Sequence, residues 1–287
     1  MIGVDCALRI RAQLGECPRW HEGEQKLYWV DIFGQTFNVF DPATGQNQAV
    51  DTPERINSFS FRSAGGLVAG CWDGFAIVED LGQAPRWLWS TPDHQPGYFL
   101  NDGRCDRRGR FWAGTVNQTY ETDGGTLYCL EPDGTITAKA SGVKASNGIA
   151  FSPDDRTIYF ADSQQHTVWA FDFDLDTASL SNRRVFAEMN RPDGAAMDED
   201  GCYWVASYEA GCVLRWTPEG KLDLRIDMPV SNPSMCAFGG PNRDVLYVTT
   251  ATYRLDDRQK AEQELAGSLF AITGLGTRGL PEPEYLG

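Results

Sequence analysis

Six short segments spread along the chain are apolar and rich in β-branched and aromatic residues, and each predicts a buried strand. They are LYWVDI (27–32), LVAGCW (67–72), RFWAGT (110–115), TIYFAD (157–162), CYWVAS (202–207) and LYVTTA (246–251). The equivalent positions are Val30, Ala69, Ala113, Ala161, Val205 and Val248. These positions are separated by 39, 44, 48, 44 and 43 residues, which is the period of a β-propeller blade.

A second strand-like run follows each of these strands and ends in a turn, often Asp-Gly, Glu-Gly or Thr-Gly. The runs are FNVFDPATG (37–45), FAIVEDLG (75–82), TLYCLEPDG (126–134), VWAFDFDLD (168–176), VLRWTPEG (213–220) and LFAITGLG (269–276). Six repeats of antiparallel strands joined by tight turns predict an all-β fold. We therefore expect a six-bladed β-propeller with a central channel, formed by residues 1–287 as a single domain.

Two further segments belong to the last repeat. Only residues 256–267 (DDRQKAEQELAG) show the periodicity of a helix, and they lie between two predicted strands of that repeat, as an insertion. Because an open sheet edge is a liability, we expect an early strand to complete the last blade. The candidate is ALRIRAQ (7–13).

Composition and charge narrow the class of protein. The chain has 287 residues, 41% of them hydrophobic and nine of them Trp, which is enough for a large globular core. The net charge of −15 opposes binding to nucleic acid or to an anionic membrane. No apolar stretch reaches the roughly 18–20 residues of a membrane helix, and residues 1–16 lack the pattern of a signal peptide. We expect a cytoplasmic protein that is a monomer.

Cysteine and histidine usage excludes several kinds of site. Eight cysteines are scattered singly without a CxxC pair, which predicts free and mostly buried thiols. The three histidines, His21, His94 and His166, show no metal-ligand spacing and are expected on the surface or in loops. So few histidines argue against a His-based triad, and no GxSxG, P-loop or GxGxxG element stands in a strand-to-helix context.

A polar residue stands at the same phase of every repeat, 12 to 16 residues before the equivalent strand position. These residues are Glu16, Asn57, Asn101, Asn147, Asp193 and Asn232. In a propeller they would start the innermost strands and converge on the axis. Carboxylate and carboxamide oxygens without histidine suit Ca²⁺, Mg²⁺ or Mn²⁺, with Zn²⁺ and Fe²⁺ also open.

Asn and Asp also begin strands and form Asx-turns, so a purely structural role competes at these positions. This interpretation is favoured for Asn57 and Asn232. For Asn147 and Asp193, which each precede a glycine, both roles stay open when each residue is taken alone. Glu16 is a poor former of such turns, and its presence makes a functional ring the favoured interpretation.

Four motifs resemble the gluconolactonase and regucalcin-like family, which includes firefly luciferin-regenerating enzyme. They are LGECPRW (14–20), LNDGRCDRRGRFWAGT (100–115), SNGIAFSPDDRTIYFADS (146–163) and RPDGAAMDEDGCYWVA (191–206). The resemblance covers nearly the whole chain. It implies a six-bladed propeller that binds one divalent cation and hydrolyses a small lactone of the sugar-acid type.

Matched motif by motif, the resemblance implies metal ligands at Glu16, Asn147 and Asp193. It also implies that Asn101 lies on the substrate side, where it touches the lactone or completes the metal shell. We expect the adjacent Asp102 to orient the turn. The ion would polarise the lactone carbonyl and stabilise the oxyanion, while Asp193 would accept a proton from the attacking water. A water on the metal or the protonated Asp193 would then supply the proton to the released alkoxide.

Two departures from the family pattern bear on the substrate. Phe99 stands where sugar-acid lactonases commonly carry Arg, two residues before the Asn of the NDG motif. Gln118 and Thr119 stand where an acidic residue is common after the AGT strand, and Glu121 is a weak substitute. These changes predict a less polar pocket, with Tyr98 and Phe99 contacting a lactone that carries fewer hydroxyls or a different ring.

Two competing functions use the same residues. The ion could serve ester or phosphotriester hydrolysis, for which a less polar pocket is an advantage. Alternatively, the chain could be a non-catalytic propeller that binds a metal or another ligand, because fold does not determine function.

Overall fold

The computed structural model describes all 287 residues as 24 strands and two short helices. The strands form six four-stranded sheets, each with antiparallel neighbours. The predicted fold class, an all-β six-bladed β-propeller, is confirmed. By its contacts the chain divides into unit 1 (Met1–Asp51 and Asp193–Leu280) and unit 2 (Thr52–Pro192 and Pro281–Gly287). The prediction of one domain over residues 1–287 stays a prediction.

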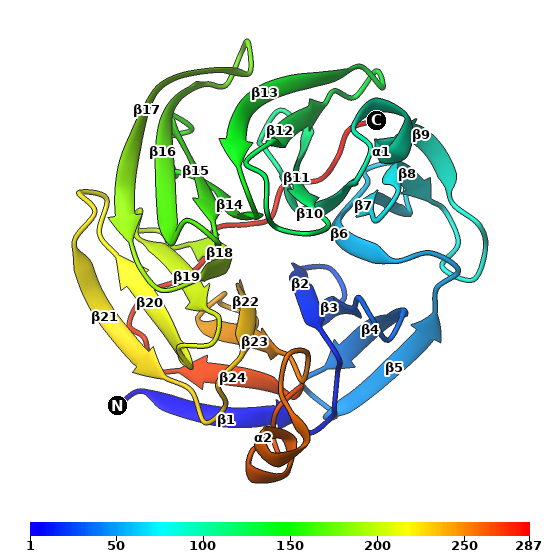
Figure 1. Ribbon diagram of the computed structural model, residues 1–287. Helices are drawn as coiled ribbons and strands as arrows, with labels where there is room; N and C mark the ends of the chain where they lie inside the picture. Colours follow the sequence, from blue (N-terminus) through cyan, green and yellow to red (C-terminus); the bar gives the residue numbers. More distant parts are fainter. The chain divides into compact units, whose positions relative to one another are not determined.

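Unit 2 contains three sheets whose strands follow one another in the sequence (Figure 1). The first sheet consists of β6 (Ile56–Phe61), β7 (Leu67–Cys71), β8 (Gly74–Val78) and β9 (Arg86–Ser90). After the helical turn α1 (Thr91–His94), the second consists of β10 (Tyr98–Cys105), β11 (Phe111–Asn117), β12 (Gly125–Leu130) and β13 (Ile136–Val143). The third consists of β14 (Ser146–Phe151), β15 (Thr157–Asp162), β16 (Thr167–Asp174) and β17 (Ser179–Glu188). In each sheet the first strands are buried, and the fourth carries most of the exposed residues.

Unit 1 contains the other three sheets. One consists of β2 (Gly15–His21), β3 (Lys26–Asp31), β4 (Thr36–Asp41) and β5 (Gln46–Asp51). Another consists of β18 (Pro192–Met197), β19 (Tyr203–Ser207), β20 (Cys212–Trp216) and β21 (Leu222–Asp227). The last consists of β22 (Pro233–Gly239), β23 (Val245–Thr250), β24 (Leu269–Thr273) and β1 (Gly3–Leu8).

The predicted completion of the last blade by an early strand is confirmed, but the strand lies earlier than residues 7–13. Figure 1 shows β1 along the outer edge of β24, where Gly3 pairs with Thr273 and Leu8 with Leu269. The backbone N–H of Ala12 instead donates to the carbonyl of Gly267 at 3.0 Å. The backbone N–H of Gln13 donates to the Asp31 carboxylate at 2.8 Å. The N–H groups of Ala12 and Gln13 are therefore already bonded and do not pair with a neighbouring strand.

The predicted helical insertion is confirmed as α2 (Asp257–Glu262), between β23 and β24. A capping box begins it, because the Asp256 carboxylate accepts from the Gln259 N–H and the Gln259 side chain accepts from the Asp256 N–H. No residue of α2 is buried, so the helix adds little to the core.

The core consists of apolar clusters within each unit, and the cysteines belong to it. Seven of the eight cysteines are buried and none forms a disulfide, as predicted; Cys6 is exposed. Burial is the main cause that raises the pKa of the Cys71 and Cys129 thiols, and neighbouring carboxylates raise it further. Neither helix is long and apolar enough to cross a membrane.

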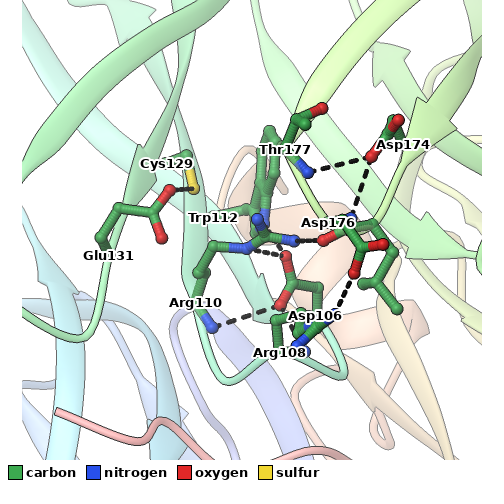
Figure 2. Close-up of polar contacts among 10 residues, drawn as sticks. Asp106, Arg108, Arg110, Trp112, Cys129, Glu131, Asp174, Asp176 and Thr177 are labelled. Atoms are coloured by element: carbon green, nitrogen blue, oxygen red, sulfur yellow. Dashed lines mark hydrogen bonds and ion pairs between the residues drawn. The ribbon is translucent and has the colours of Figure 1, made fainter.

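A buried carboxylate in the turn after β10 fixes the innermost hairpin of its sheet, as Figure 2 shows. Asp106 accepts from the Trp112 indole N–H at 2.7 Å and from Arg110 Nε at 2.7 Å. Unit 1 repeats the arrangement, because Asp198 accepts from the Trp204 indole and from Arg215, each at 2.8 Å. Two of the six sheets thus carry, in the turn after their first strand, a buried carboxylate that bonds to an indole and to an arginine.

Candidate functional site

The residues predicted to line the ring lie at irregularities of the innermost strands. The register between β2 and β3 shifts just after Glu16, and that between β14 and β15 just after Asn147. A third shift, between Leu100 and Gly103 of β10, contains Asn101. A β-bulge redirects side chains out of the regular alternation, and this frees the ring residues from ordinary strand packing.

The backbone that follows the predicted metal ligands is also unusual. Cys17, after Glu16, has φ 49°, a left-handed conformation that costs free energy for a residue with a side chain. Gly194, after Asp193, lies so close to Met235 that a Cβ would stand 2.2 Å from its Cγ. The backbone after Glu16 and after Asp193 therefore has a specific conformation that an ordinary turn would not require.

In unit 2 the ring amides bond to one another and to the next sheet. Asn101 Nδ2 donates to the Ser146 carbonyl and to Asn147 Oδ1, both at 2.9 Å. Asn147 Nδ2 donates to Ser163 Oγ at 2.8 Å, and Ser163 Oγ donates in turn to the Pro192 carbonyl. An amide oxygen has two lone pairs, so Asn147 Oδ1 can still bind a cation while it accepts from Asn101.

Asn57 makes the corresponding bond one sheet earlier. Its Nδ2 donates to the carbonyl of Leu100, and only 3% of Asn57 is exposed. This contact ties β6 to β10 and agrees with the structural role favoured for Asn57 from the sequence.

In unit 1 the two predicted carboxylate ligands act on one buried phenol. Burial raises the pKa of Tyr208, Asp193 raises it next, and Glu16 raises it further against the opposing effect of Arg254. The Tyr208 hydroxyl donates to the Tyr253 carbonyl at 2.9 Å. The charges of Glu16 and Asp193 thus both act on the pKa of a phenol whose residue is only 6% exposed.

Asn232, the sixth residue of the predicted ring, supports this phenol. Its Nδ2 donates to the Tyr208 hydroxyl at 3.3 Å and to the Tyr253 carbonyl at 3.0 Å. This agrees with the structural role that the sequence favoured for Asn232.

These donors suit a hard divalent cation. Two carboxylates, Glu16 and Asp193, and the amide oxygen of Asn147 are oxygen ligands of the kind that Ca²⁺, Mg²⁺ and Mn²⁺ prefer. No group of three or more His, Cys, Asp or Glu side chains in the structure could hold a metal ion. The expected ligand set has two carboxylates and one amide, and an amide is not among these four residue types.

The residues predicted to contact substrate have unequal exposure. Phe99 is only 4% exposed, and its ring lies under Trp72, parallel to within 4° at 3.9 Å between centroids. Tyr98 is half-buried, and its hydroxyl bonds to Thr122 Oγ1 at 2.7 Å. Of the two stacked rings, Trp72 is therefore the more exposed and Phe99 the buried one.

The structure also shows the hydrogen bonds of Asp102 and Glu121, two further residues considered in the sequence analysis. Asp102 Oδ2 accepts from the Ile149 N–H at 2.8 Å, which links β10 to β14 rather than orienting the turn as expected. Glu121, the weak substitute for a missing acid, is exposed, and its carboxylate accepts from Thr119 Oγ1 at 3.4 Å.

The sequence prediction missed Tyr208, Ser163 and Trp72. A signal was present for two of them, because Trp72 and Tyr208 each stand three residues after the equivalent positions Ala69 and Val205. An aromatic residue at the end of a central strand can reach the first strand of its own or the next sheet. Ser163 had no comparable signal, since serine is common at strand ends.

Comparisons with known proteins agree with this picture. The sequence profile of the SMP-30/Gluconolactonase/LRE-like region matches residues 14–252. The chain is 35% identical to the 6-deoxy-6-sulfogluconolactonase of Pseudomonas putida over 99% of both chains. It is 34% identical to the regucalcin of Xenopus laevis, over 100% of this chain and 99% of the other.

Solved structures give the same result. A luciferin-regenerating enzyme superposes with a TM-score of 0.90 at 26% identity, covering 100% of this chain and 99% of that one. A protein described as a calcium-binding protein, regucalcin, from Agrobacterium tumefaciens superposes with a TM-score of 0.91 at 25% identity. That match covers 98% of this chain and 96% of the other.

Proposed function

Since the chain belongs to the SMP-30/gluconolactonase/LRE-like family, we propose that it is a metal-dependent lactonase that opens a sugar-acid or related small lactone. The observation that carries the proposal is the pair of ring amides in unit 2, where Asn101 Nδ2 donates to Asn147 Oδ1 at 2.9 Å and leaves one oxygen of each side chain open to a further partner. An interaction propeller has no need for Glu16, Asn147 and Asp193 at the same phase of separate blades. The relative named for a sulfogluconolactone supports the reaction class.

Three residues would hold the ion in this proposal. Glu16, Asp193 and Asn147 offer oxygen ligands, and the calcium-binding relative supports Ca²⁺ among Ca²⁺, Mg²⁺, Mn²⁺, Zn²⁺ and Fe²⁺. A bound divalent ion supplies Lewis-acid polarisation of the ester carbonyl.

The chain's own residues account for proton transfer and orientation. Asp193 accepts a proton from water as the water oxygen bonds to the carbonyl carbon. The ring C–O bond then breaks, and protonated Asp193 returns the proton to the alkoxide, which yields a hydroxy acid. Asn101 uses both amide hydrogens within the protein, so its Oδ1 is the atom that can accept from a hydroxyl of the substrate.

The test is lactone hydrolysis by chelator-treated protein, with single divalent ions restored and a panel of aldonolactones and simple lactones. Activity should return with at least one ion. Asp193→Ala should then lower kcat by at least about a hundredfold, the usual size of general acid–base catalysis. Asp133→Ala, at an exposed turn, is the matched control and should keep full activity. Substantial turnover by Asp193→Ala would contradict the role of Asp193.

A second candidate, hydrolysis of esters or phosphotriesters, is favoured by the aromatic surface of Trp72 over Phe99. Turnover of an aryl phosphotriester under the same conditions separates it from lactone hydrolysis. If metal binds and neither substrate is hydrolysed, the non-catalytic propeller becomes the leading interpretation.

A further inference from the structure

Three side chains of unit 2 form a stack of one cation on two aromatic rings. The guanidinium carbon of Arg55 lies 5.1 Å from the centre of the Trp72 ring, and Trp72 lies parallel on Phe99. The backbone N–H of Trp72 donates to the backbone carbonyl of Arg55 at 3.0 Å, so the two residues are also joined through their main chains. Phe99 is buried, whereas Trp72 and Arg55 are both half-buried, so the stack runs from the core outward.

The stack is connected to β10, the strand that carries the predicted substrate residue Asn101. Phe99 precedes Asn101 by two residues on β10. Arg55 precedes Asn57 by two residues, and Asn57 bonds to the Leu100 carbonyl. The two ends of the stack are therefore tied to the residues that flank Asn101.

The charges around the stack define what Arg55 could bind. The chain carries a net charge of −15, and Glu54 and Asp73 adjoin the stack in sequence. An anionic group would be repelled by these neighbours, so its attraction to this place depends on Arg55. A guanidinium presents a planar fork of donors that matches the oxygens of an oxyanion, and an aromatic ring beneath it limits its motion.

We propose that Arg55 is a specificity-determining residue that binds an oxyanion substituent, a sulfonate or a phosphate, on the lactone substrate. This inference rests on the proposed lactonase function and adds the chemical class of its substrate. Trp72 contacts the apolar face of the substrate, and Asn101 Oδ1 accepts from one of its hydroxyls.

The test compares three lactones, neutral glucono-δ-lactone and its 6-phospho and 6-deoxy-6-sulfo analogues, on the wild-type chain and on Arg55→Met. The variant should lower the ratio of kcat/KM for the anionic to the neutral lactone by about ten- to a hundredfold, the usual size of a hydrogen bond to a charged group. Arg55→Lys should restore part of that ratio. The anionic lactone whose kcat/KM ratio falls more in Arg55→Met carries the preferred group, sulfonate or phosphate.

Arg183→Met is the matched control, because Arg183 also covers an indole, with its guanidinium carbon 4.1 Å from the Trp169 ring centre. It should leave the ratio unchanged. An unchanged ratio in Arg55→Met, with wild-type hydrolysis intact, overturns the assignment of Arg55 and keeps the lactonase proposal. If the wild-type chain hydrolyses none of the lactones, the lactonase proposal fails. Calorimetry of 6-phosphogluconate against gluconate on both chains then still decides whether Arg55 selects the anion.

Discussion

Asn57 and Asn101 stand at the same phase of neighbouring sheets, and each donates a hydrogen bond to the carbonyl of the residue before the next ring position. Their difference lies in exposure. Asn57 is 3% exposed, whereas Asn101 is half-buried and also bonds to the proposed ligand Asn147. The same amide thus serves packing in one sheet and is available to a substrate in the next.

Replacing these two residues should separate the two roles. Asn57→Ala leaves the Leu100 carbonyl without its donor and should lower the free energy of unfolding by about 1–3 kcal/mol, with kcat/KM little changed. Asn101→Ala should lower lactone kcat/KM by about a hundredfold or more, since it removes a substrate contact and the partner of Asn147. Urea unfolding and steady-state kinetics on both variants check this, and a large loss of activity in Asn57→Ala would contradict it.

Individual residues also show what the sequence can indicate. The period of the repeat indicates Glu16 and Asp193 as candidates because each stands at the same phase of its repeat, and their role as metal ligands stays a prediction. The effect of both on the pKa of Tyr208 could not be predicted, because it depends on the placement of β2, β18 and the residue after β19. The substrate contact of Phe99 stays a prediction, and its burial under Trp72 was not predicted because it depends on a neighbouring sheet.

At the scale of the element, the turn after β10 carries a charge pair that is almost fully buried. The side chain of Asp106 is fully buried and that of Arg110 is 4% exposed. Arg110 Nη2 also donates to the Leu175 carbonyl at 2.6 Å. Asp106 therefore stabilises its own hairpin, and Arg110 connects this hairpin to the next sheet.

Asp106→Ala should lower the free energy of unfolding by about 3–5 kcal/mol, because it leaves a buried guanidinium without its charge partner. The matched control is Asp176→Ala at the exposed ion pair with Arg108, which should cost less than about 1 kcal/mol. Denaturant unfolding of both variants measures the difference. Equal losses would show that burial does not determine the strength of these pairs.

The edge strand of the last sheet, β1, was not predicted with the correct residues. Residues 7–13 show the alternation of a strand more clearly than residues 3–8, so the pattern favoured the wrong segment. The outcome depends on distant partners, because the Asp31 carboxylate and the Gly267 carbonyl take the N–H groups of Gln13 and Ala12. An alternating pattern alone contains no information about such partners.

At the scale of the whole molecule, the fold was predictable because each blade consists of consecutive strands joined by tight turns. A repeat of this kind appears in the sequence as a period. Contacts between one sheet and the next join residues about 45 positions apart, and their detail was not predictable from the period. The bond between Asn101 and Asn147, 46 residues apart, is one such contact.

The buried thiols predict how stability changes with pH. A thiol in an unfolded chain has a pKa of about 8.5, and burial raises the pKa of Cys71 and Cys129 in the folded chain. Their contribution to stability is therefore complete below pH about 8.5 and is lost as the pH rises toward the folded pKa, since only the unfolded chain then releases the protons. Each such thiol should lower the free energy of unfolding by about 1.4 kcal/mol for every pH unit above that point.

Urea unfolding at pH 8, 9 and 10 measures this slope. Cys71→Ala removes one thiol, so its free energy of unfolding should fall less steeply with pH than that of the wild-type chain, whatever the substitution costs at pH 8. Cys6→Ala, at the exposed cysteine, should keep the wild-type slope. Identical slopes in Cys71→Ala and the wild type would mean that the Cys71 thiol also ionises in the folded chain, which its burial opposes because a thiolate is costly away from water.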